Sequence, residues 1–144
     1  MNREILFKGK RVDDGKWIYG DLLQCEGGRT LICTYVAQSK ETEGIKQFEI
    51  DISLRDVIPG TVSQYTGLND KYGNKIWEND IVSCQEGEDF GQINWNESEA
   101  GFYFDILLNA GHFCEESIDD HLYCMEVIGN VFDNPELLEG GADG

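Results

Sequence analysis

Two stretches of the chain alternate strictly between apolar and polar residues. In the first, every second residue is apolar, and these residues are Phe48, Ile50, Ile52 and Leu54. In the second, the same spacing joins Phe102, Phe104, Ile106 and Leu108. A period of two residues is typical of a β-strand, because successive side chains point to opposite faces of a sheet. Each stretch is therefore predicted to be a strand with one buried face and one solvent-exposed face.

A ten-residue pattern occurs twice, as KWIYGDLLQC at residues 16–25 and as KIWENDIVSC at residues 75–84. Each copy is predicted to hold an aromatic-rich strand, a tight turn that ends in Asp21 or Asp80, and a second apolar strand. A second pair of similar segments follows, one after each copy, at residues 56–62 and 126–131. Such repeats predict two half-chains built on one plan.

The chain shows many short apolar stretches between turn residues and no sustained 3.6-residue period, which favours an all-β fold. We predict two SH3-like small β-barrels related by internal duplication. One helical turn is expected at residues 134–138, because Asn134 suits an N-cap and Pro135 the first helical position. The predicted halves are residues 1–68 and an acidic half at 69–138, followed by a disordered tail at 139–144. Such small cores are marginal alone, so a shared interface is expected.

The acidic charge is concentrated in the second half of the chain. The net charge is −17, of which residues 1–68 contribute −1 and residues 69–144 contribute −16. No Lys or Arg follows Lys75. Because nucleic-acid binding needs cations that neutralise phosphates, we expect no direct nucleic-acid binding. The excess of acidic residues favours solubility. As an alternative, it suggests a DNA mimic that binds a nucleic-acid-binding protein of the host.

Neither a membrane nor an oxidising compartment is indicated by the sequence. No apolar run approaches the roughly 20 residues that span a bilayer, and the N-terminus has no signal-peptide core. The five cysteines form an odd set without secretory context, so reduced thiols are expected. The predicted location is the cytoplasm.

The chain resembles the YopX family of phage and prophage proteins over almost its whole length. The matching segments are ILFKGKR at 5–11, GKWIYGDL at 15–22, VSQYTGLNDK at 62–71, GNKIWENDIV at 73–82 and VIGNVFDNPELL at 127–138. The resemblance implies SH3-like β-barrel domains, a phage or prophage origin in a bacterial cytoplasm, and self-association. It implies no known activity and no catalytic residues. Residues 85–121 match the family least.

Two histidines and two cysteines form the candidate metal site, with ligand types that suit zinc. They are His112, Cys114, His121 and Cys124. The spacing differs from the paired Cys-x-x-Cys form, and an extended strand would send His121 and Cys124 to opposite faces. Two buried thiols and two surface histidines are the favoured interpretation. We therefore expect no cofactor, and a metal site or metal-dependent enzyme at residues 112–124 remains an alternative.

Two charged clusters are candidate interaction residues. The acidic cluster is Glu115, Glu116, Asp119 and Asp120, and the basic cluster is Arg3, Lys8, Lys10 and Arg11. The acidic cluster lacks the spacing of a Ca²⁺ loop, so a solvated acidic surface is favoured over a cation site. The basic cluster of one copy could contact the acidic half of a neighbour, which gives a heterologous contact between copies.

The sequence contains no Gly-x-Ser-x-Gly element and no phosphate-binding Gly-x-x-x-x-Gly-Lys-Ser/Thr loop. We therefore predict that the protein is not an enzyme. The predicted function is a protein-interaction or self-assembling module, expected to form a homo-oligomer or to bind a host or phage protein.

Overall fold

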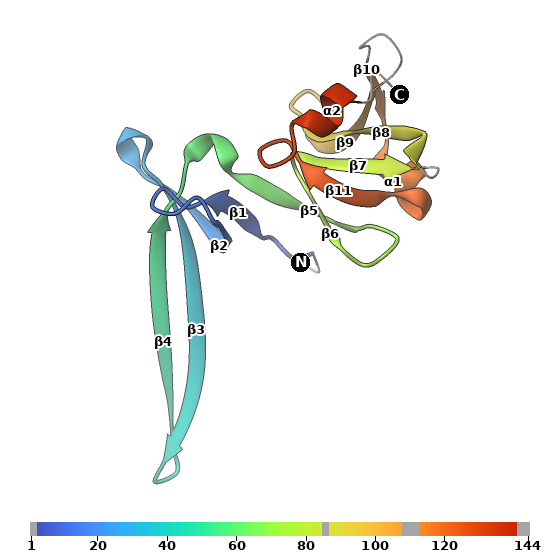
Figure 1. Cartoon of the computed structure of the whole chain (residues 1–144). Helices are drawn as coiled ribbons and strands as arrows, with labels where there is room; N and C mark the ends of the chain where they lie inside the picture. Colours follow the sequence, from blue (N-terminus) through green and yellow to red (C-terminus); the bar gives the residue numbers. More distant parts are fainter. Residues whose placement is uncertain (1–2, 85–86, 108–112, 141–144) are drawn as a thin grey trace. The chain divides into compact units, whose positions relative to one another are not determined.

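The computed structural model describes residues 3–84, 87–107 and 113–140 (Figure 1). The chain divides into two compact units, one formed by Ile5–Ser63 and the other by Met1–Glu4 with Gln64–Gly144. Strands dominate both units, and every pairing between strands described here is antiparallel. The predicted mainly β fold is confirmed, and the two antiparallel sheets of the described residues fit the expectation of two small β-barrels, although neither sheet closes into a barrel.

The Ile5–Ser63 unit is a sheet with the strand order β4-β3-β2-β1. Its strands are β1 (Phe7–Lys10), β2 (Trp17–Gln24), β3 (Thr30–Thr42) and β4 (Ile45–Asp56). The core of this sheet is small, with Leu31, Ile32 and Val57 buried. Gly20 is required where β2 meets β3, because a Cβ there would collide with the carbonyl oxygen of Cys33.

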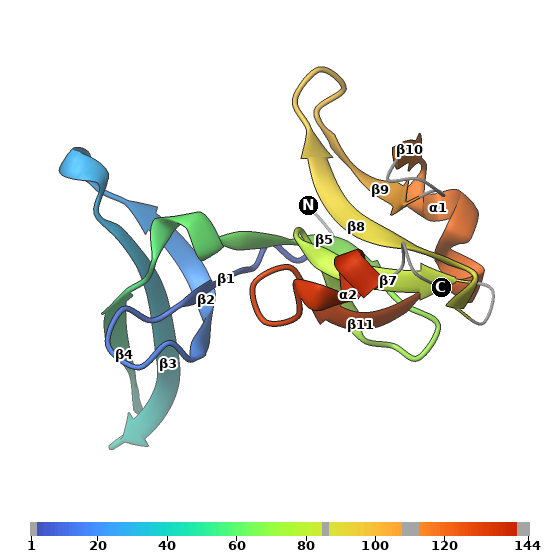
Figure 2. The same ribbon diagram turned by 45° about the horizontal axis from the view of Figure 1, so that its top comes forward.

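The hairpin of β3 and β4 extends well beyond the rest of this sheet (Figures 1 and 2). β3 pairs with β4 from Leu31↔Asp56 to Thr42↔Ile45, whereas β2 follows β3 only as far as Cys33. The hairpin turns at Glu43 and Gly44, which both have positive φ, at 54° and 78°. Positive φ at both central residues is the geometry of the two-residue turn that matches the twist of paired strands.

The Gln64–Gly144 unit carries β5 and β6 and a sheet with the order β10-β9-β8-β7-β11. Its strands are β5 (Ser63–Asn69), β6 (Lys75–Trp77), β7 (Asp80–Cys84), β8 (Asp89–Asn96), β9 (Gly101–Leu107), β10 (Phe113–Glu116) and β11 (Glu126–Asn130). The larger core of the chain lies here. It contains Ile76, Val82, Ile93, Phe104, Ile106, Ile118 and Met125.

The two copies of the repeat differ in structure. In the second copy, β6 and β7 are joined by Glu78 and Asn79, and Asn79 has a φ of 72°, which Asn tolerates better than most residues. The Asp80 carboxylate closes this turn by accepting a hydrogen bond from the Trp77 backbone N–H at 2.8 Å. In the first copy the predicted turn is wrong. β2 runs without a break through Gly20, which pairs with Phe7 of β1.

The described residues of the second unit include helical elements at residues 118–124 and 136–140. Residues 118–124 form a short α-helix, α1 (Ile118–His121), and a 3-10 helix, Leu122–Cys124. The second helix, α2 (Glu136–Gly140), overlaps the predicted helical turn at residues 136–138 and ends two residues later, at Gly140. The rest of the predicted tail, residues 141–144, lies outside the described residues. None of the helices in the described part of the chain could cross a membrane.

Asp70 holds the loop between β5 and β6 against β11. Its side chain accepts backbone hydrogen bonds from Tyr72 at 3.0 Å, Asn74 at 2.9 Å and Val127 at 3.0 Å. Burial of the carboxylate is the largest single influence on its pKa and raises it, but the hydrogen bonds together lower the pKa below its ordinary value. Asp70 therefore stabilises this unit as a carboxylate.

Candidate functional site

One face of the β3–β4 hairpin is apolar and exposed to solvent. The residues of this hairpin face are Tyr35, Phe48, Ile50, Ile52 and Leu54. Their exposed fractions lie between 47% for Leu54 and 74% for Phe48. The alternation predicted for this stretch is confirmed, but its predicted buried face is wrong. Contiguous exposed apolar surface on this scale marks interaction sites in soluble proteins.

The register of the hairpin explains why these side chains lie together. Tyr35 pairs with Ile52, Ala37 with Ile50, and Cys33 with Leu54. Directly opposed residues of an antiparallel pair project from the same face. Beyond Cys33, β3 pairs with β4 but no longer with β2, so the hairpin continues as a two-stranded ribbon. A two-stranded ribbon is marginal in water by itself, because it has no layer against which to bury side chains.

Opposite charges stand at the two ends of the apolar row on β4. Lys46 precedes Phe48 on the same face near the tip, and Asp56 follows Leu54 at the base. Arg29 donates to both oxygens of Asp56, at 2.8 and 3.1 Å. These hydrogen bonds, and then the positive charge of Arg29, lower the pKa of Asp56, although partial desolvation acts in the other direction. The base of the row therefore carries a carboxylate at neutral pH.

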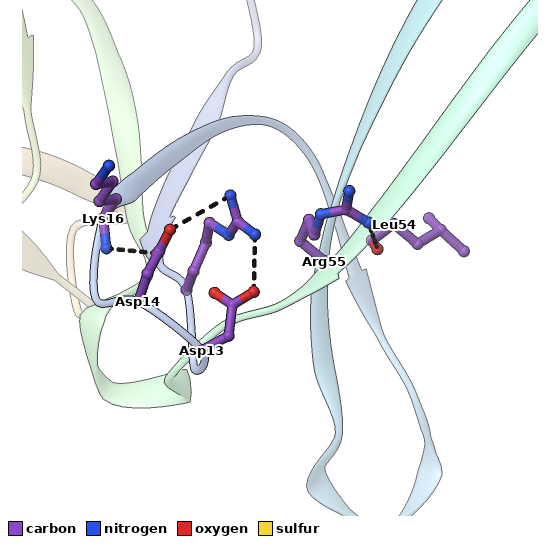
Figure 3. A network of polar contacts seen from close by, with 6 residues as sticks. Asp13, Asp14, Lys16, Leu54 and Arg55 are labelled. Atoms are coloured by element: carbon purple, nitrogen blue, oxygen red, sulfur yellow. Dashed lines mark hydrogen bonds and ion pairs between the residues drawn. The ribbon is translucent and has the colours of Figure 1, made fainter.

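The opposite side of β4 is mainly polar. Gln47, Glu49, Asp51, Ser53 and Arg55 occupy its alternate positions. The Arg55 guanidinium lies back along the strand and donates to the Leu54 carbonyl at 3.2 Å (Figure 3).

Three of the four basic residues named from the sequence contact groups of their own unit. Lys8 is only 6% exposed and its Nζ lies 4.5 Å from the Trp17 ring centroid, with Lys10 at 5.5 Å. Arg11 contacts Asp13 at 2.7 Å and Asp14 at 3.5 Å (Figure 3). The hydrogen bond to Asp13 is the main reason that the pKa of Arg11 is raised. Arg3 is exposed.

The acidic residues named from the sequence are divided between β10 and α1. Glu115 and Glu116 belong to β10, whereas Asp119 and Asp120 belong to α1 and are exposed. The nearby Asp105 of β9 faces Glu115 across the strand pair. Burial, and then the charge of Glu115, raise the pKa of Asp105. A contact of this surface with the basic residues of another copy stays a prediction.

The predicted zinc ligands are only partly brought together. His121 and Cys124 lie close to Cys84, with one potential ligand atom from each side chain within 4.8 Å of the others. Cys114 lies on β10, where its thiol is 3.6 Å from Glu116 Oε1. His112 lies outside the described residues. Cys84 was not named from the sequence, and only its place at the end of the second repeat sets it apart.

A helical turn explains why His121 and Cys124 meet. The sequence-based objection assumes an extended strand, but α1 ends at His121 and the following 3-10 helix ends at Cys124. Residues three apart lie on one side of such a turn. The thiols of Cys84 and Cys124 both donate to the His121 carbonyl oxygen, at 3.4 and 3.2 Å. This shared hydrogen-bond acceptor therefore keeps the two sulfur atoms close together.

The surroundings of two thiols, those of Cys84 and Cys114, favour the protonated form. Burial, together with the neighbouring Cys124, raises the pKa of Cys84 to about 12. Desolvation and the adjacent Glu116 raise the pKa of Cys114 as well. A thiol is a strong nucleophile only as the thiolate. Neither cysteine is prepared for nucleophilic catalysis.

The chain has recognisable similarity to known proteins. The crystal structure of protein EF1440 from Enterococcus faecalis is similar, with a TM-score of 0.56 and 22% sequence identity over 95% of this chain and 99% of that chain. At this identity the likeness shows a common fold. No curated protein matches the sequence. The sequence profile of the YopX protein matches residues 6–139, which is nearly the whole chain. The chain therefore belongs to the YopX family.

Proposed function

We propose that this protein is a non-enzymatic, self-associating module, and that two copies pack through their hairpin faces with the two β4 strands antiparallel. The observation that carries the proposal is the exposed apolar row of the β3–β4 hairpin. The partner is a second copy of the same chain, and the contact is isologous because the same face is used by both copies.

The size of the hairpin face supports a contact between two proteins. Covering its five side chains would remove on the order of 600 Å² of apolar surface from each copy, against about 800 Å² per partner in a standard interface. At about 25 cal/mol per Å², such burial supplies a substantial driving force before the entropic cost of association is subtracted. A dimer of moderate affinity fits this area.

The order of charges along β4 supports a second copy in the antiparallel direction. Lys46, the four apolar residues and Asp56 follow one another on one face. An antiparallel stack centred on the row brings Lys46 of one copy to Asp56 of the other, at both ends. Glu41 stands opposite Lys46 and Arg29 binds Asp56 within each copy, so the antiparallel stack is favoured by the additional contacts between Lys46 and Asp56 of the two copies. Two such faces stack about 10 Å apart, as in a β-sandwich.

The non-enzymatic part of the proposal is supported by the raised pKa values of Cys84 and Cys114, which keep both thiols protonated near neutral pH. Membership in the YopX family supports a phage-type protein. We propose that it acts in the cytoplasm of a bacterial host, with assembly as its mode of action.

The test compares the oligomeric state of two variants that add the same charge to opposite faces of β4. Ile50→Glu alters the hairpin face, and Gln47→Glu is the matched control on the other face. Light scattering coupled to size exclusion, from low to high micromolar protein, should give twice the 16.3 kDa chain mass for the wild type and for Gln47→Glu. Ile50→Glu should give the monomer mass.

Because both positions are exposed, neither variant should change the circular dichroism spectrum of the folded protein. A wild-type monomer throughout the concentration range would refute self-association. A dimer that is equally stable in Ile50→Glu would show that another surface makes the contact.

A further inference from the structure

We propose that Cys84, His121 and Cys124 bind one zinc ion, with the two sulfur atoms and one imidazole nitrogen as ligands. This set lies in the Gln64–Gly144 unit and shares no residue with the hairpin face. Thiolate and imidazole are the ligand types that zinc prefers, and three protein ligands leave the fourth tetrahedral position for water.

The positions of the three side chains are close to those of a zinc site. Their potential ligand atoms all lie within 4.8 Å of one another. With Zn–S near 2.3 Å and Zn–N near 2.0 Å, tetrahedral angles place ligand atoms roughly 3.5–3.8 Å apart. From separations of at most 4.8 Å, the three groups therefore need to approach by about 1.3 Å at most, which side-chain torsions can supply.

The backbone already holds these residues near one another. Cys84 ends β7 and belongs to the main core with an exposed fraction of 1%. His121 and Cys124 are presented from one helical turn, and Cys124 packs against the same core. The His121 ring meets Phe104 edge to face, with ring centroids 5.5 Å apart. The imidazole is therefore positioned by a core aromatic residue.

A second observation points to a ligand at this place. The Nδ1 atom of His121 is buried and has no hydrogen-bond partner among the described residues. Buried polar atoms in folded proteins almost always have a partner. A metal bound through Nδ1 would give this nitrogen the partner that it lacks among the described residues.

Binding changes the bonding of the thiols in a simple way. Each cysteine releases one proton to solvent as its S–H bond is replaced by a Zn–S bond, and the imidazole binds in its neutral form. The two thiolate charges balance the charge of Zn²⁺, so the completed site adds no net charge to the core. No oxidation or reduction is involved.

The experiment measures zinc binding by the full-length protein under reducing conditions. Chain purified without chelator is given Zn²⁺ and analysed by native mass spectrometry, and Co²⁺ is used in parallel as a spectroscopic probe. The expected result is one metal ion per chain, a rise in the melting temperature with Zn²⁺, and the charge-transfer absorption of a cobalt–thiolate bond.

Two cysteine variants make the test specific. Cys124→Ser should lower zinc affinity more than about 100-fold, because losing even an outer-shell partner of a metal ligand typically costs about 10–100-fold. Cys33→Ser is the control, since Cys33 lies on β3 in the other unit and should leave binding unchanged. Cys124 is only partly buried, so its serine variant is better tolerated than a change at Cys84.

Three results would overturn the proposal. The first is a bare chain mass with no thermal shift when Zn²⁺ is in excess. The second is equal zinc affinity in Cys124→Ser and the wild type. The third is a native chain lighter by two hydrogen atoms because Cys84 and Cys124 form a disulfide that persists in reductant. None of these depends on whether the hairpin face self-associates.

Discussion

β4 and β9 carry almost the same alternating pattern, yet they differ in burial. On β9, Phe104 is 0% exposed and Ile106 is 6% exposed. On β4, Phe48 and Ile50 are among the most exposed apolar residues of the described chain. The comparison shows that alternation defines which face of a strand is apolar, but not whether anything covers that face.

The neighbours of the two strands account for the difference. β9 lies between β8 and β10, and its apolar side chains pack in a core with Ile118 and Met125. β4 is an edge strand that pairs with β3 alone over most of its length. Exposed edges of this kind are ready to pair or pack with another chain. The apolar face of β9 is covered within its own unit, whereas the hairpin face stays exposed.

The largest expected effect comes from truncating one phenylalanine in each strand. Phe104→Ala should reduce the free energy of unfolding of its unit by about 3–5 kcal/mol, because it leaves a cavity in a packed core. Phe48→Ala should change monomer stability by less than about 0.5 kcal/mol, as expected for an exposed site. Urea denaturation of dilute protein measures both values. Equal losses would mean that the two strands are equally covered.

A smaller effect is expected at Asp70, which stabilises only the unit with the covered strand. Asp70→Asn should cost about 1.5–3 kcal/mol at neutral pH, because the carboxylate accepts several backbone hydrogen bonds. The folded pKa of Asp70 is lowered, so its contribution is present above the ordinary aspartate pKa near 3.8 and is lost as the pH falls through the folded value. Denaturation at pH 7 and near pH 3 should show the wild-type advantage shrinking.

The control for this measurement is Asp119→Asn, because Asp119 is exposed on α1. It should leave stability unchanged at both pH values. Glu78 acts in the opposite direction in the same unit, since burial raises its pKa. Only the difference between the wild type and Asp70→Asn therefore isolates Asp70. A pH-independent difference would show that its charge is not involved.

The smallest expected effect lies at the tip of the hairpin. Gly44→Ala should destabilise the turn by about 1 kcal/mol, because a φ of 78° is unfavourable for a residue with a Cβ. Hydrogen exchange of residues 34–53, followed by mass spectrometry, should become faster in the monomer. Exchange of β8 and β9 should not change. Faster exchange in those strands would show that the hairpin contributes to their stability.

The sequence by itself determined the strand class, the two alternating faces, the turn at Glu78 and Asn79, and the family. These features depend on local geometry, since side-chain alternation and turn preferences involve residues that are neighbours in the chain. The same reasoning failed at Gly20, where local turn preference was overridden by pairing with Phe7 on another strand.

Only the tertiary structure decided which apolar face is covered and which thiol joins His121. Cys84 lies 37 residues from His121, and a helical turn at 118–124 was needed to place His121 and Cys124 on one side. The alternating pattern identified the apolar residues of β4, but the prediction placed them in a core, whereas they are exposed. Burial and long-range clustering depend on how strands pair across the chain, and a periodic pattern contains no information about which neighbour will cover it.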